Sequence, residues 1–360
     1  MNPARTLGPV KIVGTGLIGT SIGLALRGLG VEVLLSDSSP ASLNLAVDFG
    51  AGIKFQPGQK PQLVVVCVPP DVTAAVISSE LALHPEAVVT DVASVKGTVL
   101  KDLTSSSDLT RYVGSHPMAG REQSGTLAGR SDIFAGRPWV ICSNENSSAQ
   151  ARLLVEQLAL DLGATVVSMN PEDHDRAVAV VSHTPQIISS LLAARLAESD
   201  PKDVALAGQG LRDTTRIAAS DSKLWMQILA ANSHEVARVL SQLRDDLDKV
   251  LDSLENVEQA GSLAAIGKLL EKGNNGVARI PGKHGQRATE YAKITVMIDD
   301  SPGQLAKLLT EIGEAGINLE DLTLEHATGA AVGLPELYVL PSSKQKLETE
   351  LTSRGWKIVG

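Results

Sequence analysis

The sequence predicts a multi-domain α/β protein with a doubly wound, mainly parallel sheet, followed by an all-helical domain and a small mixed domain. Short β-branched runs alternate with helix-like stretches up to about residue 170, which is the pattern of βαβ units. Beyond Pro171 these runs stop, and apolar residues recur every three or four positions, which indicates helices. The 360 residues, 43% of them apolar, suffice for about two or three domains with real cores.

The first domain is expected to cover residues 1–170. Its predicted strands are Val10 to Val13, Val31 to Leu35, Leu63 to Val68, Ala87 to Val89, Tyr112 to Gly114, Trp139 to Cys142 and Thr165 to Met169. A GxGxxG motif follows the first strand directly and opens a helix with one apolar face. In that context Gly14 permits a tight turn, Gly16 lets the backbone approach a pyrophosphate, and Gly19 lets the helix lie close to the sheet. This favours a Rossmann dinucleotide-binding domain; the alternative is that the glycines only make a sharp turn.

Asp37 ends the second predicted strand, where an acid would hydrogen-bond the adenine ribose of a dinucleotide. A carboxylate at this position would repel the 2′-phosphate of NADP, and the neighbouring serines supply no cation. The sequence therefore favours NAD. The predicted cofactor-binding residues are Gly14, Gly16, Leu17, Ile18, Gly19, Asp37 and Pro69.

The second domain, residues 171–270, is expected to be entirely helical. Its longest predicted helix starts at Asn232 and runs for about 24 residues. One apolar stripe on this helix comprises Val236, Val239, Leu240, Leu243, Leu247, Val250, Leu251 and Leu254. The stripe exceeds what a small domain needs, so we expect a homodimer in which it packs against a second subunit. An intrachain helical hairpin is the alternative.

Residues 271–289 are predicted to be a linker, because four glycines occur there with almost nothing to bury. Residues 290–360 then follow the order strand, helix, strand, strand, helix, strand, which is the ferredoxin-like arrangement. The expected elements are Ala292 to Ile298, Gly303 to Ala315, Asn318 to His326, Glu336 to Leu340, Ser343 to Arg354 and Trp356 to Val359.

Composition argues against several classes of partner. With 41 acidic and 32 basic residues the net charge is -9, which gives no basic field for nucleic acid. No apolar run approaches the roughly 18 to 20 residues of a membrane span, and the first strand starts too early for a signal peptide. We therefore expect a cytoplasmic protein without a membrane partner. Cys67 and Cys142 are expected to be reduced core residues, and no metal site is predicted.

Two short motifs follow later strands, at the sheet edge where ligands bind in open α/β folds. Ser94 lies in the segment from Asp91 to Lys96, and it could act in catalysis or cap the helix that follows. His116 belongs to a His-Pro step in a glycine-rich turn. It has no helical or core role to perform there, so it is the stronger catalytic candidate.

Over about residues 9–255 the order of motifs resembles the prephenate/arogenate dehydrogenase family. The matching segments are Gly14-x-Gly16-Leu17-Ile18-Gly19-x-Ser21, Asp91-x-x-Ser94-x-Lys96, Ser115-His116-Pro117-Met118-x-Gly120, Ser182-His183-x-Pro185 and Leu211-Arg212-Asp213-x-Thr215-Arg216-Ile217-Ala218, with Trp225. Residues 290–360 resemble an ACT regulatory domain. The segments that carry this second resemblance are Asp300-Ser301-Pro302-Gly303-x-Leu305 and Gly316-Ile317-Asn318.

The resemblance implies NAD-dependent oxidative decarboxylation of prephenate to 4-hydroxyphenylpyruvate, on the route to tyrosine. His116 would accept the ring hydroxyl proton as general base, Ser94 would orient that hydroxyl or His116, and Lys96 would support the loop. Arg216 would clamp a substrate carboxylate, with an ion pair to Asp213, three residues earlier, as its alternative. The other implied substrate-binding residues are Arg212, His183, Gln186 and Glu122. For Arg212 the alternative is a surface ion pair, and for His183 a satisfied histidine of the helical domain.

Arogenate, which would give tyrosine directly, is the alternative substrate, because Gln186 stands where some prephenate-specific members of the family carry histidine. Glu122 could pair with the ammonium of arogenate. A 3-hydroxyacid or imine-type dehydrogenase and a non-catalytic regulator that binds NAD and an amino acid are further alternatives. The ACT resemblance implies that tyrosine binds and inhibits near Pro302, Gly303, Gly316 and Asn318.

Overall fold

The computed structural model describes residues 3–103, 108–120, 125–281, 291–326 and 332–359. The chain divides into two compact units, Met1–Leu251 and Asp252–Gly360. Each unit has its own core and is described by itself.

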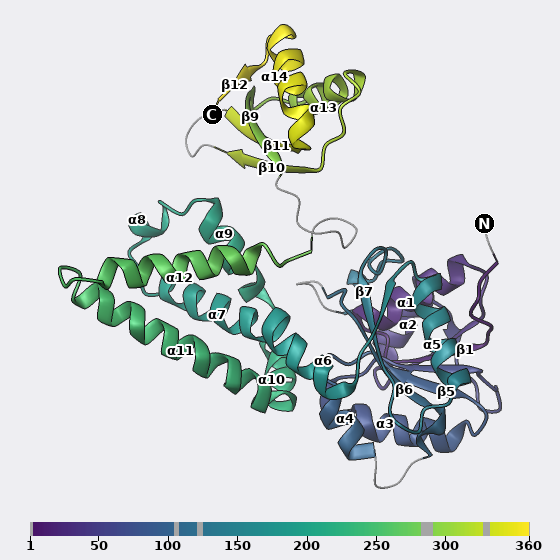
Figure 1. The fold of residues 1–360 in the computed structure, drawn as a ribbon. Coiled ribbons are helices and arrows are strands. Elements are labelled where there is room, and N and C mark those ends of the chain that lie inside the picture. The colour runs from purple at the N-terminus through teal and green to yellow at the C-terminus, as the bar shows by residue number, and fades with distance from the viewer. Residues whose placement is uncertain (1–2, 104–107, 121–124, 282–290, 327–331, 360) are drawn as a thin grey trace. The chain divides into compact units, whose positions relative to one another are not determined.

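The first unit begins with a Rossmann-type sheet of eight strands in the order β3-β2-β1-β4-β5-β6-β7-β8 (Figure 1). The strands are β1 (Val10–Val13), β2 (Val33–Ser36), β3 (Ile53–Lys54), β4 (Leu63–Val66), β5 (Val88–Asp91), β6 (Tyr112–Pro117), β7 (Pro138–Cys142) and β8 (Thr165–Ser168). Neighbouring strands run parallel except for β6 and β7. Each predicted strand of this domain is present. Strand β3 was not predicted, because its two residues are exposed and leave no buried apolar run in the sequence.

Helices cover both faces of this sheet. They are α1 (Leu17–Gly28), α2 (Pro40–Asp48), α3 (Pro70–Leu83), α4 (Gly97–Leu103) and α5 (Ala149–Asp161), with the short 3-10 helices η1 (Leu109–Arg111) and η2 (Thr126–Ala128). Alternate residues of β4 enter two separate cores: Leu63 and Val65 belong to one, and Val64 and Val66 to the other. This two-sided burial explains why the strands are continuously apolar. Both cysteines are free; Cys142 is buried, and Cys67 is partly buried just after β4.

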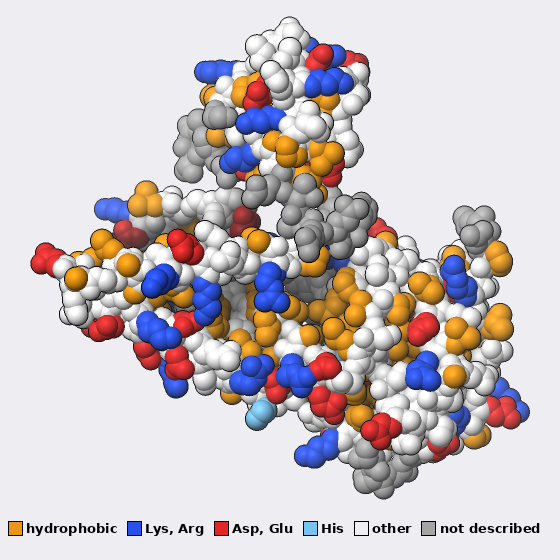
Figure 2. All heavy atoms as spheres, in the orientation of Figure 1, with side chains coloured by type: hydrophobic (Ala, Val, Ile, Leu, Met, Phe, Trp, Pro, Cys, Tyr) orange, Lys and Arg blue, Asp and Glu red, His pale blue; other side chains and the backbone are white. Residues whose placement is uncertain are grey.

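The rest of the first unit is helical, as predicted. Its elements are α6 (Pro171–Val178), the π-helical turn η3 (Ala179–His183), α7 (Thr184–Leu196), α8 (Pro201–Val204), α9 (Gln209–Thr215), η4 (Arg216–Ala219), α10 (Ser222–Ala231) and α11 (Ser233–Glu255). Helix α11 agrees closely with the long helix predicted from Asn232. Leu243, Leu247 and Leu251 on this helix are 41%, 56% and 47% exposed. Apolar side chains lie among charged ones on the visible surface of this helical region (Figure 2).

Helix α6, the π turn and α7 form one continuous helix, Pro171–Leu196, that is long and apolar enough to cross a membrane by length and composition. The expectation that no segment reaches this length was wrong. The residues between Arg176 and Arg195 include no Asp, Glu, Lys or Arg, and scattered polar residues such as Ser182 and Gln186 hide the length of the apolar segment. Of its most apolar window, 33% is buried inside the protein. His174 and Asp175 on α6 are buried and hydrogen-bonded to the sheet domain. Such paired polar groups are typical of a helix in a folded domain.

The second unit contains α12 (Ser262–Val277) and a small α/β module. The module consists of β9 (Ala292–Asp299), α13 (Gln304–Glu314), β10 (Asp321–His326), β11 (Val332–Val339), η6 (Pro341–Ser343), α14 (Lys344–Ser353) and β12 (Lys357–Ile358). Its strands form an antiparallel sheet in the order β10-β11-β9-β12. Apolar residues of β9, β11, α13 and α14 build its core.

The predicted start of the linker at Glu271 was too early. Helix α12 continues to Val277 and includes Gly273 and Gly276. An isolated glycine costs a helix only about 1 kcal/mol relative to alanine. Helix α12 therefore tolerates Gly273 and Gly276, as it tolerates Gly267, because good helix formers such as Leu, Ala and Lys make up most of the turns before them. Residues 282–289 of the predicted linker lie outside the described part of the chain.

Candidate active site

The glycine-rich turn joins β1 to α1 and leaves its outer side open. Gly14 has a φ of 98°, and a Cβ there would lie 2.4 Å from the carbonyl oxygen of Cys67. A Cβ on Gly19 would lie 2.0 Å from the carbonyl oxygen of Gly14, whereas a Cβ on Gly16 would meet nothing within 4 Å. Helix α1 begins after Gly16 without a side-chain cap. Two glycines are thus required by packing, and the third leaves room for an anion at a helix N-terminus.

Asp37 follows β2 and is anchored beside this turn. Its Oδ2 accepts hydrogen bonds from the amide and the hydroxyl of Thr15, at 2.6 and 2.8 Å, and its Oδ1 accepts one from the amide of Ser39 at 2.7 Å. Pro69 is the N-cap residue of α3, just after β4, and a Cβ on Gly14 would also approach the neighbouring Val68. These positions fit a dinucleotide: an open turn for the pyrophosphate, and a fixed carboxylate for the ribose hydroxyls. Leu17 and Ile18 form the first turn of the helix behind them.

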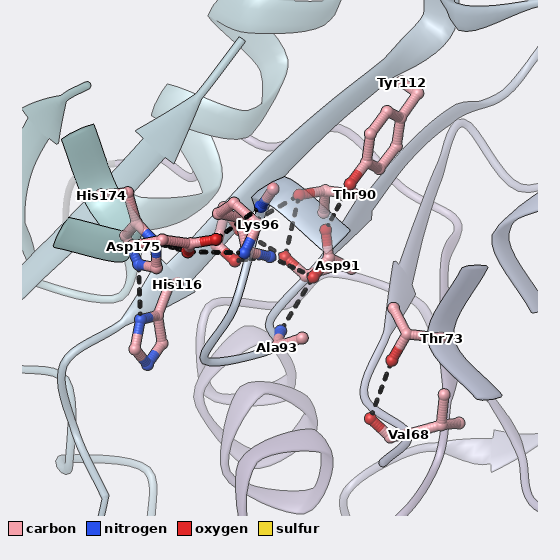
Figure 3. A network of polar contacts seen from close by, with 12 residues as sticks. Val68, Thr73, Thr90, Asp91, Ala93, Lys96, Tyr112, His116, His174 and Asp175 are labelled. Carbon is pink, nitrogen blue, oxygen red and sulfur yellow. Dashed lines mark hydrogen bonds and ion pairs between the residues drawn. The ribbon is translucent and has the colours of Figure 1, made fainter. Parts of the chain in front are cut away.

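A buried ion pair lies where β5 and β6 end (Figure 3). The ammonium of Lys96 pairs with the carboxylate of Asp91 and donates a hydrogen bond to the carbonyl oxygen of Ser115 at 2.8 Å. The hydroxyl of Tyr112 donates to the other oxygen of Asp91 at 2.7 Å. Lys96 is 1% exposed and Asp91 is fully buried. Lys96 therefore joins the end of β5 to the carbonyl group of Ser115, the residue before His116. This arrangement is consistent with the predicted support of the His-Pro segment.

His116 lies on β6, opposite Val140 of β7, and not in a turn as the sequence predicted. It is the first member of a chain of polar contacts (Figure 3). Its Nδ1 is 2.9 Å from Nε2 of His174, and Nδ1 of His174 is 2.8 Å from Oδ1 of Asp175. Asp175 also accepts hydrogen bonds from the amides of Lys96 and Gly97, at 2.9 and 2.8 Å. Burial lowers the pKa of His116 well below its ordinary value, and positive charge on His174 or Lys96 lowers it further. At neutral pH His116 is thus an uncharged imidazole, which is the form that a general base requires.

Ser94 lies in the loop between β5 and α4 and is partly exposed. As an N-cap it would accept hydrogen bonds from amides two or three positions later, which are those of Lys96 and Gly97. Both amides instead donate to Asp175, a residue of α6. Ser94 is therefore not the residue that caps this helix, because both amides are already hydrogen-bonded to Asp175.

His183 and Gln186 lie inside the helical region. The ring of His183 packs edge-on against Trp225, with 6.0 Å between centroids, and the amide of Asn232 donates to its Nδ1 at 3.1 Å. That bond places the ring proton on Nε2, which is buried and without a partner among the described residues. Burial lowers the pKa of His183 to about 4. Gln186 is 6% exposed, and its amide lies 3.4 Å from the hydroxyl of Ser190.

Comparison with known proteins places this geometry in a family. The family model "Prephenate dehydrogenase, nucleotide-binding domain" matches residues 22–168, and "Prephenate dehydrogenase, dimerization domain" matches residues 170–268. The chain is 38% identical to "Probable prephenate dehydrogenase NovF" of Streptomyces niveus over 96% of this chain and 98% of that protein.

Two solved structures share the fold. One is prephenate dehydrogenase from Aquifex aeolicus in complex with hydroxyphenyl propionate and NAD+, with a TM-score of 0.65 and 26% identity. It covers 76% of this chain and 99% of its own. The other is Synechocystis arogenate dehydrogenase, with a TM-score of 0.62 and 25% identity over 74% of this chain and 98% of its own.

The chain belongs to the prephenate dehydrogenase family. It is accordingly an NAD-dependent oxidoreductase, as the glycine turn and Asp37 predicted. The alternatives of an imine-type or 3-hydroxyacid dehydrogenase and of a non-catalytic regulator are set aside by this membership. The family match begins at residue 22, so the assignment of the glycine turn itself depends on its geometry in this chain.

The remaining predicted substrate residues include Arg212 and Arg216, on two elements that both pack against α7, the helix of Gln186. Arg212 lies in the last turn of α9 and Arg216 begins the 3-10 helix after it, and both are exposed. Asp213, the suggested alternative partner of Arg216, accepts a hydrogen bond from Gln209 at 2.7 Å. Glu122 lies outside the described residues. Within those residues, no group of His, Cys, Asp and Glu side chains is arranged to hold a metal ion.

Several residues of the site were not predicted. His174 is not among the residues that the sequence singled out, yet it contacts His116 across a sequence separation of 58. Asp175 and Asn232 were likewise missed, although Asn232 links His183 to the carbonyl oxygen of Asp175. The sequence signals no more than an adjacent His-Asp pair within a helix, and it does not show that this pair contacts β6 and the start of α4.

Proposed function

We propose that this protein is an NAD-dependent prephenate dehydrogenase, which converts prephenate to 4-hydroxyphenylpyruvate and carbon dioxide. The observation that carries the proposal is His116, an uncharged, partly buried imidazole at the carboxyl end of the sheet, backed by a hydrogen-bonded histidine and carboxylate. The names of the relatives and the fit of the glycine turn to a dinucleotide support it.

In this proposal the chain's own residues carry the proton. The ring hydroxyl of prephenate gives its proton to Nε2 of His116 while the carbinol carbon releases a hydride, for which bound NAD supplies the acceptor. The ring carbon–carboxylate bond then breaks, carbon dioxide leaves, and the bonding electrons complete the aromatic ring as a phenolate. The phenolate takes up the proton held by His116. Ser94 hydrogen-bonds the reacting hydroxyl or orients His116.

Prephenate is proposed over arogenate because arogenate carries an ammonium, and burying that charge requires an acid or several acceptors. Gln186 is a neutral amide beside Ser190, and His183 presents an N–H. Neither group pairs with a cation as a carboxylate would. Arg216 and Arg212 are proposed to hold a substrate carboxylate. NADH formation measured in parallel with prephenate and arogenate tests the choice, and a tenfold preference of kcat/KM for arogenate would reverse it.

We further propose that residues 290–360 are an ACT regulatory domain that binds tyrosine. The order of elements and the sheet order β10-β11-β9-β12 support a ferredoxin-like fold. Gly303 and Gly316, with φ angles of 92° and 66°, form the turns before and after α13. Pro302 precedes Gly303, and Asn318 lies two residues after Gly316. The side-chain amide of Asn318 donates a hydrogen bond to the carboxylate of Glu320 at 2.9 Å. Backbone groups at these turns are the proposed contacts of the amino acid.

We also propose a homodimer, in which the exposed leucines of α11 pack against a second copy. The family's dimerization domain and the 41–56% exposure of Leu243, Leu247 and Leu251 support it. The proposed domains are residues 1–170, 171–270 and 290–360, with the linker starting only after Val277. We propose that the protein is soluble and located in the cytoplasm. Sedimentation of the full chain tests the dimer, and a monomer at micromolar concentration would contradict it.

A further inference from the structure

We propose that His174 and Asp175 are positioning residues that set which ring nitrogen of His116 carries the proton. They place it on Nδ1, so that Nε2 keeps its lone pair for the substrate hydroxyl. The inference deepens the proposed function, because it rests on His116 as the general base.

The direction of each hydrogen bond follows from Asp175. A carboxylate accepts hydrogen bonds and donates none, and this one accepts two backbone amides, those of Lys96 and Gly97. Burial raises the pKa of Asp175, but the hydrogen bonds from His174, Lys96 and Gly97 lower it, and the net shift is downward. Asp175 is therefore ionised at neutral pH. Nδ1 of His174, which lies 2.8 Å from Oδ1 of Asp175, must be the donor.

The same reasoning continues to His116. In the tautomer with its proton on Nδ1, His174 has a lone pair on Nε2, and this atom lies 2.9 Å from Nδ1 of His116. Nδ1 of His116 is then the donor in that contact, and Nε2 of His116 is the acceptor. His174 is fully buried, so water offers no competing partner. One carboxylate on α6 thus determines the tautomer of a base on β6.

The contacts of His116 also affect the positive charge that it acquires when it accepts the substrate proton. When Nε2 of His116 accepts the substrate proton, the imidazolium faces the nearby ammonium of Lys96, which disfavours it. Lys96 is itself paired with Asp91. The Nδ1 proton of His116 can shift toward Nε2 of His174, whose other nitrogen is held by the Asp175 carboxylate. The positive charge is then shared with a group that has an anionic partner.

The position of Asp175 is fixed from several sides. Its carboxylate holds the two amides at the start of α4, and its carbonyl oxygen accepts a hydrogen bond from Asn232 at 2.8 Å. Gly97 leaves room for this approach, since a Cβ there would lie only 2.9 Å from Oδ2 of Asp175. The two amide hydrogen bonds hold the carboxylate toward His174, which is what a residue that selects a tautomer requires.

The test compares His174→Leu with His174→Gln in the full-length enzyme. Leucine removes the acceptor, whereas the carbonyl of glutamine can still accept the Nδ1 proton. We expect kcat with prephenate to fall about 10²- to 10³-fold for leucine and about 10-fold for glutamine, since a wrong tautomer costs a comparable triad about 10⁴. The KM for prephenate and the Kd for NAD should change less than about threefold. A purely structural role would lower the folded fraction and leave kcat per NAD-binding site unchanged.

A second measurement does not depend on the folding of a variant. In ¹⁵N-histidine NMR of the parental enzyme at pH 7.5, His116, assigned by its loss in His116→Asn, should show a protonated Nδ1 and an unprotonated Nε2. A proton on Nε2 of His116, a leucine variant with near-parental kcat, or a glutamine variant as slow as leucine would each overturn the inference. Failure of the proposed function looks different: the parental enzyme would not oxidise prephenate, or His116→Asn would remain active.

Discussion

Thr15 donates two hydrogen bonds to Asp37, one from its amide at 2.6 Å and one from its hydroxyl at 2.8 Å. The glycine turn and the acid that follows β2 are therefore joined, and the carboxylate is fixed beside the turn. A fixed carboxylate favours ribose hydroxyls and repels a 2′-phosphate.

We predict that NAD is used at least about tenfold better than NADP, a difference of about 1.4 kcal/mol. Thr15→Val keeps the amide bond and loses the hydroxyl bond, so the KM for NAD should rise by about three- to tenfold. Thr15→Ser, which retains a hydroxyl, is the control and should stay near the parental value. Equal kcat/KM with NAD and NADP would contradict the role of Asp37.

The pH dependence should report the lowered pKa of His116. The base must be neutral to accept a proton, so activity is lost as the pH falls through its pKa. Because burial lowers that pKa, kcat/KM for prephenate should stay level through pH 6.5, the ordinary histidine value, and fall only at lower pH. A pH profile at saturating NAD measures this. An acidic limb centred at or above 6.5 would mean that His116 is exposed or is not the base.

Lys96→Met should destabilise the protein strongly. The substitution leaves the carboxylate of Asp91 buried without its cation, and breaking a buried pair in this way costs about 3 to 5 kcal/mol. Urea unfolding followed by circular dichroism measures the loss. Lys54→Met, at an exposed position on β3, is the matched control. A Lys96 variant as stable as this control would show that the pair is not needed for folding.

Removal of the C-terminal module should separate catalysis from regulation. A chain that ends after Ile280, beyond α12, is expected to oxidise prephenate and to ignore tyrosine, whereas the full chain should be inhibited roughly 5- to 150-fold. Gly303→Asp should weaken inhibition without changing NAD binding, because φ there is 92° and a side chain strains the turn. If the truncated enzyme remains as sensitive to tyrosine, inhibition arises at the active site.

The sequence predicted the structure best where a residue type or a short run has a direct effect on the local backbone. Gly14 and Gly19 could be recognised because glycine is required wherever a Cβ would collide with backbone. Continuous apolar runs such as β4 identified strands that are buried on both faces. Strand β3 and the last turns of α12 were missed, since neither has a strong local pattern.

Contacts between distant segments could not be predicted. His174 was not recognised because its relation to His116 exists only after α6 packs beside β6, 58 residues away in the chain. The same holds for Asp175, whose carboxylate caps α4 from another element. Ser94, in contrast, was a candidate N-cap from the sequence. In the structure, Asp175 of α6 caps α4 instead.

The most direct test of the account is the turnover of prephenate by the parental enzyme and by His116→Asn. NADH formation is followed by absorbance, and NAD binding and circular dichroism are measured on the same preparations. The parental enzyme should reduce NAD with one carbon dioxide released per NADH. The variant should bind NAD normally and lose kcat by about 10² to 10⁴, the range for a removed general base. A parental enzyme inactive with prephenate, or a folded variant that turns over at the parental rate, would contradict the account.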